Sequence, residues 1–255
     1  MGENNKVVIV TGGSSGIGRC TASALKENGC IVYEFSRRNI PMEGVTHLSV
    51  DVTDEDAVNA AVQQVIQCAG FGISGAVEFT SMEQAKAQFD VNFFGTVTVN
   101  KAVLPFLRHQ GKGHIVNISS VAAVAHIPFQ TFYSASKAAV SSYSYALANE
   151  VKPYGIHVTV VELGDICTEF TKARQKSILG DDEYGGRISR SVSQMEHDEQ
   201  NGMDPARIGR YIAGIVEKKK PAVVYVAGAQ YKFLSLLCKL LPAAARGKIV
   251  GKIYG

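Results

Sequence analysis

Residues 7–18 read Val7-Val8-Ile9-Val10-Thr11-Gly12-Gly13-Ser14-Ser15-Gly16-Ile17-Gly18. The first four are apolar and β-branched, which is typical of a buried parallel strand. A helical pattern from Arg19 to Asn28 follows and stops at Gly29. A strand, a glycine turn and a helix start together form a cradle for pyrophosphate, because glycine lets a ligand approach the backbone and the helix start offers free N–H groups. The alternative is a tight turn that binds no ligand.

A second pattern lies in the middle of the chain, where Tyr133 and Lys137 stand four residues apart in a predicted helix. Such positions share one face, so the phenol and the ammonium point the same way. The pKa of a free tyrosine is about 10, and a neighbouring cation lowers it, which makes the phenol a better acid and base near neutrality. Ser120 can hold a substrate oxygen beside the phenol. The alternative for the pair alone is an ordinary contact on a helix surface.

The motifs resemble those of the short-chain dehydrogenase/reductase superfamily over residues 6–170, and the overall look is closest to its hydroxysteroid and retinol dehydrogenase-like members. The positions that match are Gly12, Gly16, Gly18, Asp51, Val52, Ala69, Gly70, Asn92, Ser120, Tyr133, Lys137, Gly164, Ile166 and Thr168. These motifs are specific for the family and much less so for the substrate.

The resemblance implies a catalytic tetrad of Asn92, Ser120, Tyr133 and Lys137. In this assignment Tyr133 exchanges the proton and Ser120 holds the substrate oxygen. Lys137 lowers the tyrosine pKa and binds the nicotinamide ribose. Asn92 anchors a water in the proton relay behind Lys137.

The choice of cofactor follows from the second predicted strand, which ends at Ser36 and is followed by Arg37 and Arg38. NAD-binding proteins of this fold commonly carry an acid here, whereas guanidinium groups suit the 2′-phosphate of NADP(H). The alternatives are a solvated pair of arginines, or a strand that ends earlier and presents Glu34. With the resemblance, the predicted cofactor contacts are Gly12, Ser14, Ser15, Gly16, Ile17, Gly18, Arg37, Arg38, Asp51, Val52, Ala69, Gly70, Tyr133, Lys137, Gly164, Ile166 and Thr168.

Strands and helices alternate along the chain, which predicts a single α/β domain over residues 1–255 with a Rossmann-type, doubly wound parallel sheet. The predicted strands are 6–11, 30–36, 46–50, 113–119, 156–162 and 222–226. The predicted helices are 17–28, 54–62, 81–109, 131–152 and 204–218, the third of which should kink or end at Pro105. A ligand is then expected at the carboxyl ends of the strands.

One segment is shorter than the family pattern, because only seventeen residues separate Asp51 from Ala69. Either a helix runs from Asp54 to Gln67 and the fourth strand is missing, or the helix is short and Gln64–Cys68 form that strand. We favour the second, because losing a central strand would leave a gap of about 4.8 Å and unpaired backbone groups.

We expect no nucleic-acid partner and no metal. The net charge is only +3, and the five cysteines have no paired spacing, which favours reduced thiols in a cytoplasm. The chain opens with a polar stretch, and we see neither a signal peptide nor an apolar run long enough to span a membrane. We expect a homodimer or homotetramer.

The remaining segments suggest a lid and a tail. Residues 169–203 are long, polar and glycine-spotted, which suits a lid over the cofactor. Phe129, Gln130, Phe132 and residues 71–75 are expected to line a pocket for a bulky apolar ketone or alcohol of steroid, retinoid or lipid type. The tail, residues 229–255, is basic and amphipathic. It would pack on the core, form a subunit interface, or make a weak contact with a membrane surface.

The function predicted from these features is NADP(H)-dependent interconversion of a ketone and a secondary alcohol. The rival is a catalytically weak NADPH-binding protein with a regulatory or scaffolding role, which the shortened segment motivates and the complete tetrad opposes.

Overall fold

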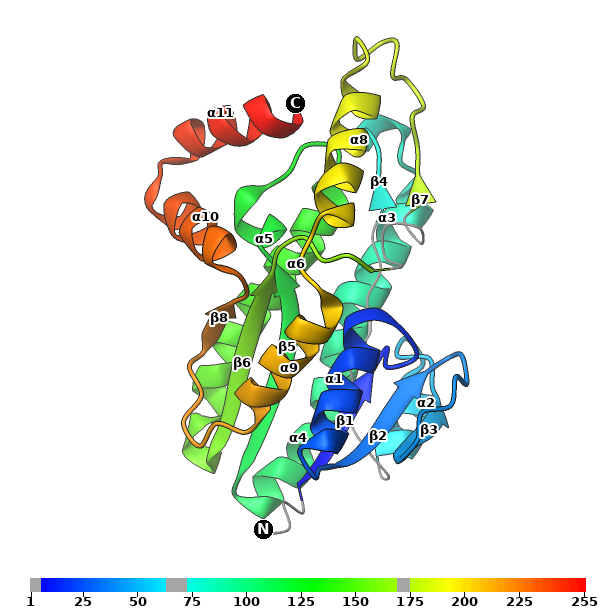
Figure 1. The fold of residues 1–255 in the computed structure, drawn as a ribbon, viewed down its shortest axis with the longest axis vertical. Coiled ribbons are helices and arrows are strands. Elements are labelled where there is room, and N and C mark those ends of the chain that lie inside the picture. Colours follow the sequence, from blue (N-terminus) through cyan, green and yellow to red (C-terminus); the bar gives the residue numbers. More distant parts are fainter. Residues whose placement is uncertain (1–5, 63–72, 169–174) are drawn as a thin grey trace.

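The computed structural model describes residues 6–62, 73–168 and 175–255. Figure 1 shows parallel strands in the middle of the molecule with helices on both faces, which confirms the predicted α/β fold. The strands are β1 (Val7–Thr11), β2 (Ile31–Ser36), β3 (Val45–Ser49), β4 (Ile73–Ser74), β5 (Gly113–Ser120), β6 (Ile156–Leu163), β7 (Gln175–Lys176) and β8 (Val224–Val226). The α-helices are α1 (Gly16–Glu27), α2 (Glu55–Val62), α3 (Met82–Phe89), α4 (Gly95–Gln110), α5 (Ala122–Ala125), α6 (Thr131–Val151), α8 (Arg187–Gln200), α9 (Pro205–Val216), α10 (Ala229–Leu240) and α11 (Ala243–Tyr254).

The described strands form two parallel halves and one small pair. One half has the order β1-β2-β3, the other has the order β5-β6-β8, and β4 pairs with β7. Every strand pair in the two halves is parallel, as predicted. Because parallel strands point the same way, the loops that follow the strands of one half all lie at the carboxyl-terminal edge of that half.

The predicted fourth strand, Gln64–Cys68, lies outside the described residues, and so do Ala69 and Gly70. The assignment of Val65 and Ile66 to a strand therefore stays a prediction. Within the described residues, β1 and β5 form the inner edges of the two halves and do not pair with each other. Within the described residues, contacts made by helices link these two halves.

Helices make those contacts on both faces of the sheet. On one face α1 and α9 lie side by side, and a Cβ added to Gly209 of α9 would stand 2.5 Å from the Cys20 backbone of α1, so this close approach requires glycine. On the other face one buried apolar cluster joins Phe35 of β2, Val103 of α4 and Ile115 of β5. The two halves are thus linked through close-packed helices above and below the strands.

The helix predicted over 81–109 is interrupted, but not at Pro105. A π-helical turn, Asp90–Phe94, separates α3 from α4, and α4 then continues through Pro105 to Gln110. The prediction of a helix end at Pro105 is wrong, because this residue lies on the exposed side of α4, where water can satisfy the carbonyl that loses its partner.

Four α-helices lie outside the helix ranges predicted from the sequence, namely α5, α8, α10 and α11. α8 occupies the lid segment, with Ile188 and Val192 buried. α10 and α11 form a V-shaped hairpin at the C-terminus, which we call the C-terminal arm (residues 229–254; Figure 1, orange to red). Tyr254 of the arm donates a hydrogen bond to Asp198 of α8 at 3.0 Å, so the arm and the lid helix are joined.

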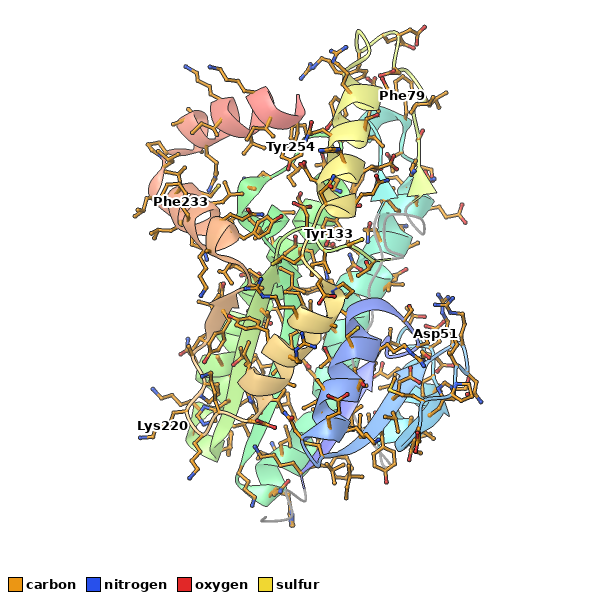
Figure 2. The ribbon with its side chains drawn as sticks, viewed as in Figure 1. Asp51, Phe79, Tyr133, Lys220, Phe233 and Tyr254 are labelled. Atoms are coloured by element: carbon orange, nitrogen blue, oxygen red, sulfur yellow. The ribbon has the colours of Figure 1, made fainter. Side chains whose placement is uncertain are left out.

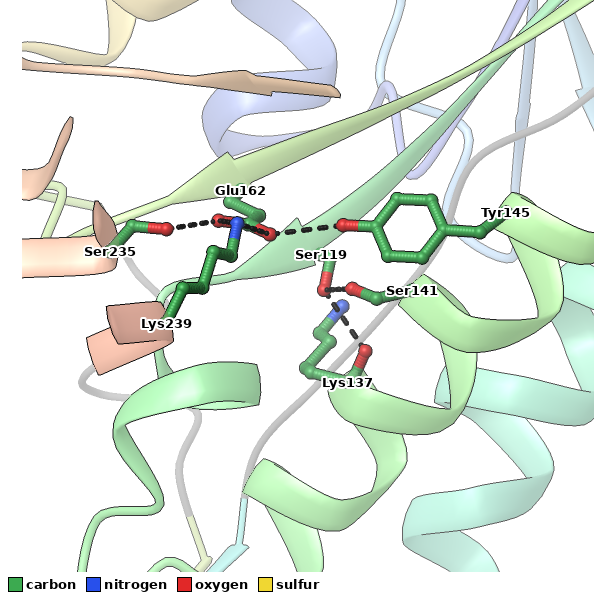
Figure 3. Close-up of polar contacts among 7 residues, drawn as sticks. All are labelled: Ser119, Lys137, Ser141, Tyr145, Glu162, Ser235 and Lys239. Carbon is green, nitrogen blue, oxygen red and sulfur yellow. Dashed lines mark hydrogen bonds and ion pairs between the residues drawn. The ribbon is translucent and has the colours of Figure 1, made fainter. Parts of the chain in front are cut away.

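A buried carboxylate fixes α10 to the sheet (Figure 3). Glu162 of β6 has no exposed surface. It accepts hydrogen bonds from Ser235 at 2.7 Å and Tyr145 at 3.2 Å, and the Lys239 ammonium lies 2.9 Å away. Burial, followed by the nearby Glu162 charge, raises the pKa of Tyr145 to about 12, so this phenol stays a donor. The arm is therefore held by a charged network within the fold.

Replacing Lys239 by Met should destabilise the protein by about 1–3 kcal/mol, because the Glu162 carboxylate then loses its countercharge while it remains buried. Urea denaturation of the full chain measures this change. Lys232→Met removes the same charge from an exposed position of the same helix and should shift stability by less than about 0.5 kcal/mol. Equal stabilities for the two variants would contradict the role given to Lys239.

Candidate active site

The glycine turn between β1 and α1 has the geometry of a phosphate cradle. Gly12 and Gly16 adopt positive φ angles of 60° and 53°, which side-chain-bearing residues rarely adopt. A Cβ on Gly18 would stand 2.4 Å from the Gly12 carbonyl oxygen, so the turn can close only on glycine. Thr168 lies beside the turn, 3.7 Å from where a Cβ on Gly16 would stand. The start of α1 thus presents backbone N–H groups to an anion.

The two arginines lie beside this cradle at the end of β2. Arg38 donates a hydrogen bond to the Ser15 hydroxyl at 3.3 Å. Arg37 is 78% exposed and lies 4.0 Å from the Asp51 carboxylate. Both guanidinium groups are therefore accessible next to the helix start, as a 2′-phosphate contact requires.

Glu34 does not occupy the ribose position. β2 continues to Ser36, and Glu34 is buried within it, with its carboxylate 2.5 Å from Nδ1 of His47. A Cβ on Gly13 would overlap the Glu34 side chain, so the carboxylate lies beneath the turn. The alternative in which the strand ends early and presents this acid is excluded.

Asp51 and Val52 follow β3 at the same edge. The Thr53 backbone N–H donates to the Asp51 carboxylate, and this bond is the largest cause that lowers the pKa of Asp51. Val52 is buried against Gly95, where a Cβ would stand 2.9 Å from a Val52 methyl group. Asp51 is therefore a fixed, ionised acceptor in the wall of the cradle.

Tyr133 and Lys137 lie one turn apart at the start of α6. The Lys137 ammonium is 5.8 Å from the centre of the Tyr133 ring and donates to the Ile118 carbonyl at 3.2 Å. Ser119 of β5 bonds both the Lys137 carbonyl and the Ser141 hydroxyl, which ties α6 to β5 (Figure 3). The predicted side-by-side arrangement of phenol and ammonium is present, and Lys137 is buried.

Ser120 ends β5 and faces the same crevice. Its hydroxyl oxygen accepts a hydrogen bond from the Ala122 backbone N–H at 3.1 Å, which leaves the hydroxyl proton for donation to a substrate oxygen. Asn92 lies in the π turn and donates to the Ser136 hydroxyl at 3.1 Å. Because Ser136 directly precedes Lys137, this hydrogen bond connects Asn92 to α6 at the position next to the lysine. Its proposed role in holding a water stays a prediction.

The loop after β6 completes the site. Gly164 contacts the ring of Tyr231 from α10 so closely that a Cβ would stand 2.3 Å from the ring. The Tyr231 hydroxyl donates to Asp165 at 2.8 Å. Burial raises the pKa of Asp165, and burial with the Asp165 charge raises that of Tyr231 to about 12. The buried Ile166 forms a single bridge to Met203, which holds the loop against the segment after α8.

One cavity of about 1870 Å³ gathers these groups. Of the predicted site residues that the structure describes, Asn92 alone is not in its wall; the others line it: Gly12, Ser14, Ser15, Gly16, Ile17, Gly18, Arg37, Arg38, Asp51, Val52, Ser120, Tyr133, Lys137, Gly164, Ile166 and Thr168. The cavity also extends between β1 and β5, where Val8 and Ile115 line it. Figure 2 places Tyr133 at the centre of the molecule and Asp51 at one side.

The wall of the substrate side differs from the prediction. Gln130 lines the cavity, but Phe129 and Phe132 are not among its lining residues. Phe129 instead packs with Ile188 and Val192 of α8, in a buried cluster beneath the lid helix. Residues 71 and 72 lie outside the described residues.

The C-terminal arm supplies wall residues that the sequence did not reveal. They are Tyr231, Leu234, Ile249, Val250, Ile253 and Tyr254. The sequence offers one signal for this contact. Gly164 has no side chain and leaves space for a ring, and the neighbouring Asp165 is a hydrogen-bond acceptor for a phenol. Nothing local identified Tyr231 as the partner.

Comparisons with known proteins agree with this geometry. The family model for short chain dehydrogenases matches residues 6–178. A 3-ketodihydrosphingosine reductase from Bacteroides thetaiotaomicron is 43% identical over 229 residues, which cover 85% of this chain and 85% of the relative.

Solved structures share the fold. A short-chain dehydrogenase from Streptomyces avermitilis has a TM-score of 0.82 and 27% identity, with 99% of each chain covered. A short chain dehydrogenase from Burkholderia cenocepacia, in complex with NADP, has a TM-score of 0.76 and 24% identity over 98% of this chain and 99% of that one. The family match and the relative with 43% identity show that the chain belongs to the short-chain dehydrogenase/reductase family of oxidoreductases.

Proposed function

We propose that this protein is an NADP(H)-dependent oxidoreductase that interconverts a ketone and a secondary alcohol on a long-chain, lipid-like substrate. The observation that carries this proposal is the single cavity in which Ser120, Tyr133 and Lys137 share walls with the glycine turn. A cofactor bound along the turn would bring its nicotinamide end to these three side chains. That arrangement fits carbonyl chemistry and gives each residue a role.

The roles follow from the hydrogen bonds. When bound, a nicotinamide cofactor supplies or accepts the hydride. Ser120 donates its hydroxyl proton to the carbonyl oxygen and fixes it beside the phenol. Tyr133 transfers a proton to that oxygen during reduction and takes it back during oxidation. Lys137, held by the Ile118 carbonyl, places its positive charge beside the phenol and favours the phenolate.

The preference for NADP(H) rests on Arg37 and Arg38. Both are exposed at the end of β2, where an acid would repel a phosphate, and the only acid within this strand, Glu34, is buried under the turn. Arg38 already contacts Ser15, so a 2′-phosphate at this position would meet a guanidinium and a hydroxyl together.

The proposed substrate class rests on the arm and on one relative. The cavity wall from Leu234, Val250 and Ile253 is apolar and suits a hydrocarbon chain. The relative with 43% identity is a 3-ketodihydrosphingosine reductase, whose named substrate carries a ketone on a long chain. We infer that a long-chain 3-ketone is the substrate.

A second candidate function is that of a catalytically weak NADPH-binding protein. It is motivated by the shortened segment of seventeen residues between Asp51 and Ala69. In that case the cofactor would bind to the glycine turn while the catalytic side chains stood too far away for efficient hydride transfer. Measuring both binding and turnover distinguishes the two candidates.

Tyr133→Phe should lower turnover by about a hundredfold or more, because it removes only the hydroxyl that exchanges the proton. NADPH affinity, followed by cofactor fluorescence, should stay within a small factor of the wild type. Tyr154→Phe makes the same change at an exposed tyrosine that does not line the cavity, and should leave turnover unchanged. A Tyr133→Phe variant that retains a tenth of the wild-type rate would rule out the assignment. Lys137→Ala should reduce both rate and cofactor affinity.

The double variant Arg37→Ala/Arg38→Ala should lose most of the preference for NADPH over NADH, because each charge-assisted phosphate contact contributes roughly 1.5–3 kcal/mol. The ratio of kcat/KM with the two cofactors measures the preference. Lys86→Ala/Arg108→Ala removes the same charge from exposed positions outside the cavity and should leave that ratio unchanged. A wild-type protein that uses NADH as efficiently as NADPH would contradict the proposal.

Among ketones of increasing chain length offered with NADPH, kcat/KM should rise with length, since each buried methylene contributes about 0.8 kcal/mol. 3-Ketodihydrosphingosine should be reduced better than a short 3-ketone. A preference for short, polar ketones would refute the substrate class but leave the reaction type intact.

A further inference from the structure

The outer face of the C-terminal arm is apolar and exposed. On α10, Phe233, Leu236 and Leu240 are 68%, 56% and 73% exposed, and their spacing places them on one face of the helix. Figure 2 shows Phe233 on the outer side of the arm. Side chains of this size are normally covered, so a continuous row of them marks a contact surface.

Positive charge borders this apolar face. Lys232 flanks the row on α10, and on α11 Lys248 and Lys252 lie next to Ile249 and Ile253 with a spacing of four residues. Within residues 229–254 the arm contains five basic residues and no acidic one. An apolar stripe edged by lysines is the pattern of a helix that lies on an anionic lipid surface.

The inner face of the same arm belongs to the cavity. Tyr231, Leu234, Val250 and Tyr254 line it, and Tyr254 points inward toward α8 in Figure 2. Ile249 and Ile253 are both exposed and part of the cavity wall, so they stand at its rim. Apolar surface therefore continues from the outside of the arm into the cavity.

We propose that the C-terminal arm is a docking surface for an anionic membrane, on which the protein rests while a long-chain substrate passes from the lipid into the cavity over Ile249 and Ile253. The docking itself goes beyond the proposed function, whereas the passage of substrate rests on it. No helix in the described ranges 6–62, 73–168 and 175–255 is long and apolar enough to cross a bilayer.

The charge pattern disfavours a second copy of the chain as the occupant. In a symmetric dimer built on this face, the arm would contact its own equivalent. Lysines would then face lysines with no acidic residue of the arm to compensate them. An anionic lipid surface supplies the opposite charge along the whole arm.

Co-sedimentation of the full chain with vesicles tests the proposal. The protein should bind vesicles of equal parts phosphatidylcholine and phosphatidylglycerol, bind pure phosphatidylcholine poorly, and be released by high salt. Charge reversal in Lys232→Glu/Lys248→Glu/Lys252→Glu should lower binding by about a hundredfold or more, since one lysine near an anionic surface contributes roughly fivefold. The matched control is Lys218→Glu/Lys219→Glu/Lys220→Glu, at the opposite end of the molecule in Figure 2, which should bind like the wild type.

The apolar row is tested separately with Phe233→Ser/Leu236→Ser/Leu240→Ser, and Met82→Ser/Phe106→Ser serves as its control, since those residues are exposed elsewhere. The first variant should lose vesicle binding and keep its NADPH affinity and its turnover of a soluble ketone, whereas the control should keep all three. If the wild-type protein does not bind anionic vesicles, the proposal is overturned, whether or not the protein reduces ketones. Equal losses in the lysine variant and its control would overturn it too, as would a change of oligomeric state, measured by light scattering, in the apolar variant alone.

Discussion

The structure depends on keeping its two strand halves at a fixed separation. The glycine turn belongs to the half that contains β1, whereas Ser120, Tyr133 and Lys137 belong to the half that contains β5. A nicotinamide cofactor must span both, and reacting groups misplaced by about 1 Å lose much of their rate. In the described residues that separation is set by helix packing, with Gly209 against Cys20 on one face and the cluster around Phe35 and Ile115 on the other.

The C-terminal arm shows how distant segments complete a site that local motifs begin. Glu162 fixes α10 to the sheet through Ser235 and Lys239, and Tyr231 then packs on Gly164 in the loop after β6. Through Tyr254 and Asp198 the arm also joins α8. A change in the arm can therefore reach α8 and the cavity wall together.

The sequence predicts those parts of the site whose geometry is local. The glycine turn and the pair Tyr133 and Lys137 are set by short spacings within one turn or one helix, and each has the predicted form. The wall formed by Tyr231 depends on packing between distant segments, which leaves no periodic pattern in the chain. The interruption at Asp90–Phe94 was missed because proline is the stronger local signal, although exposure makes Pro105 tolerable.

The most direct measurement follows a labelled hydride. NADPH that carries deuterium at its transferable C4 position is mixed with 3-ketodihydrosphingosine and the full chain, and the alcohol product is examined by mass spectrometry. We predict that deuterium appears on the former carbonyl carbon, because the glycine turn and the catalytic side chains line one cavity. NADPH that binds tightly and transfers no deuterium to this or any shorter ketone would show that the two halves do not form a working active site.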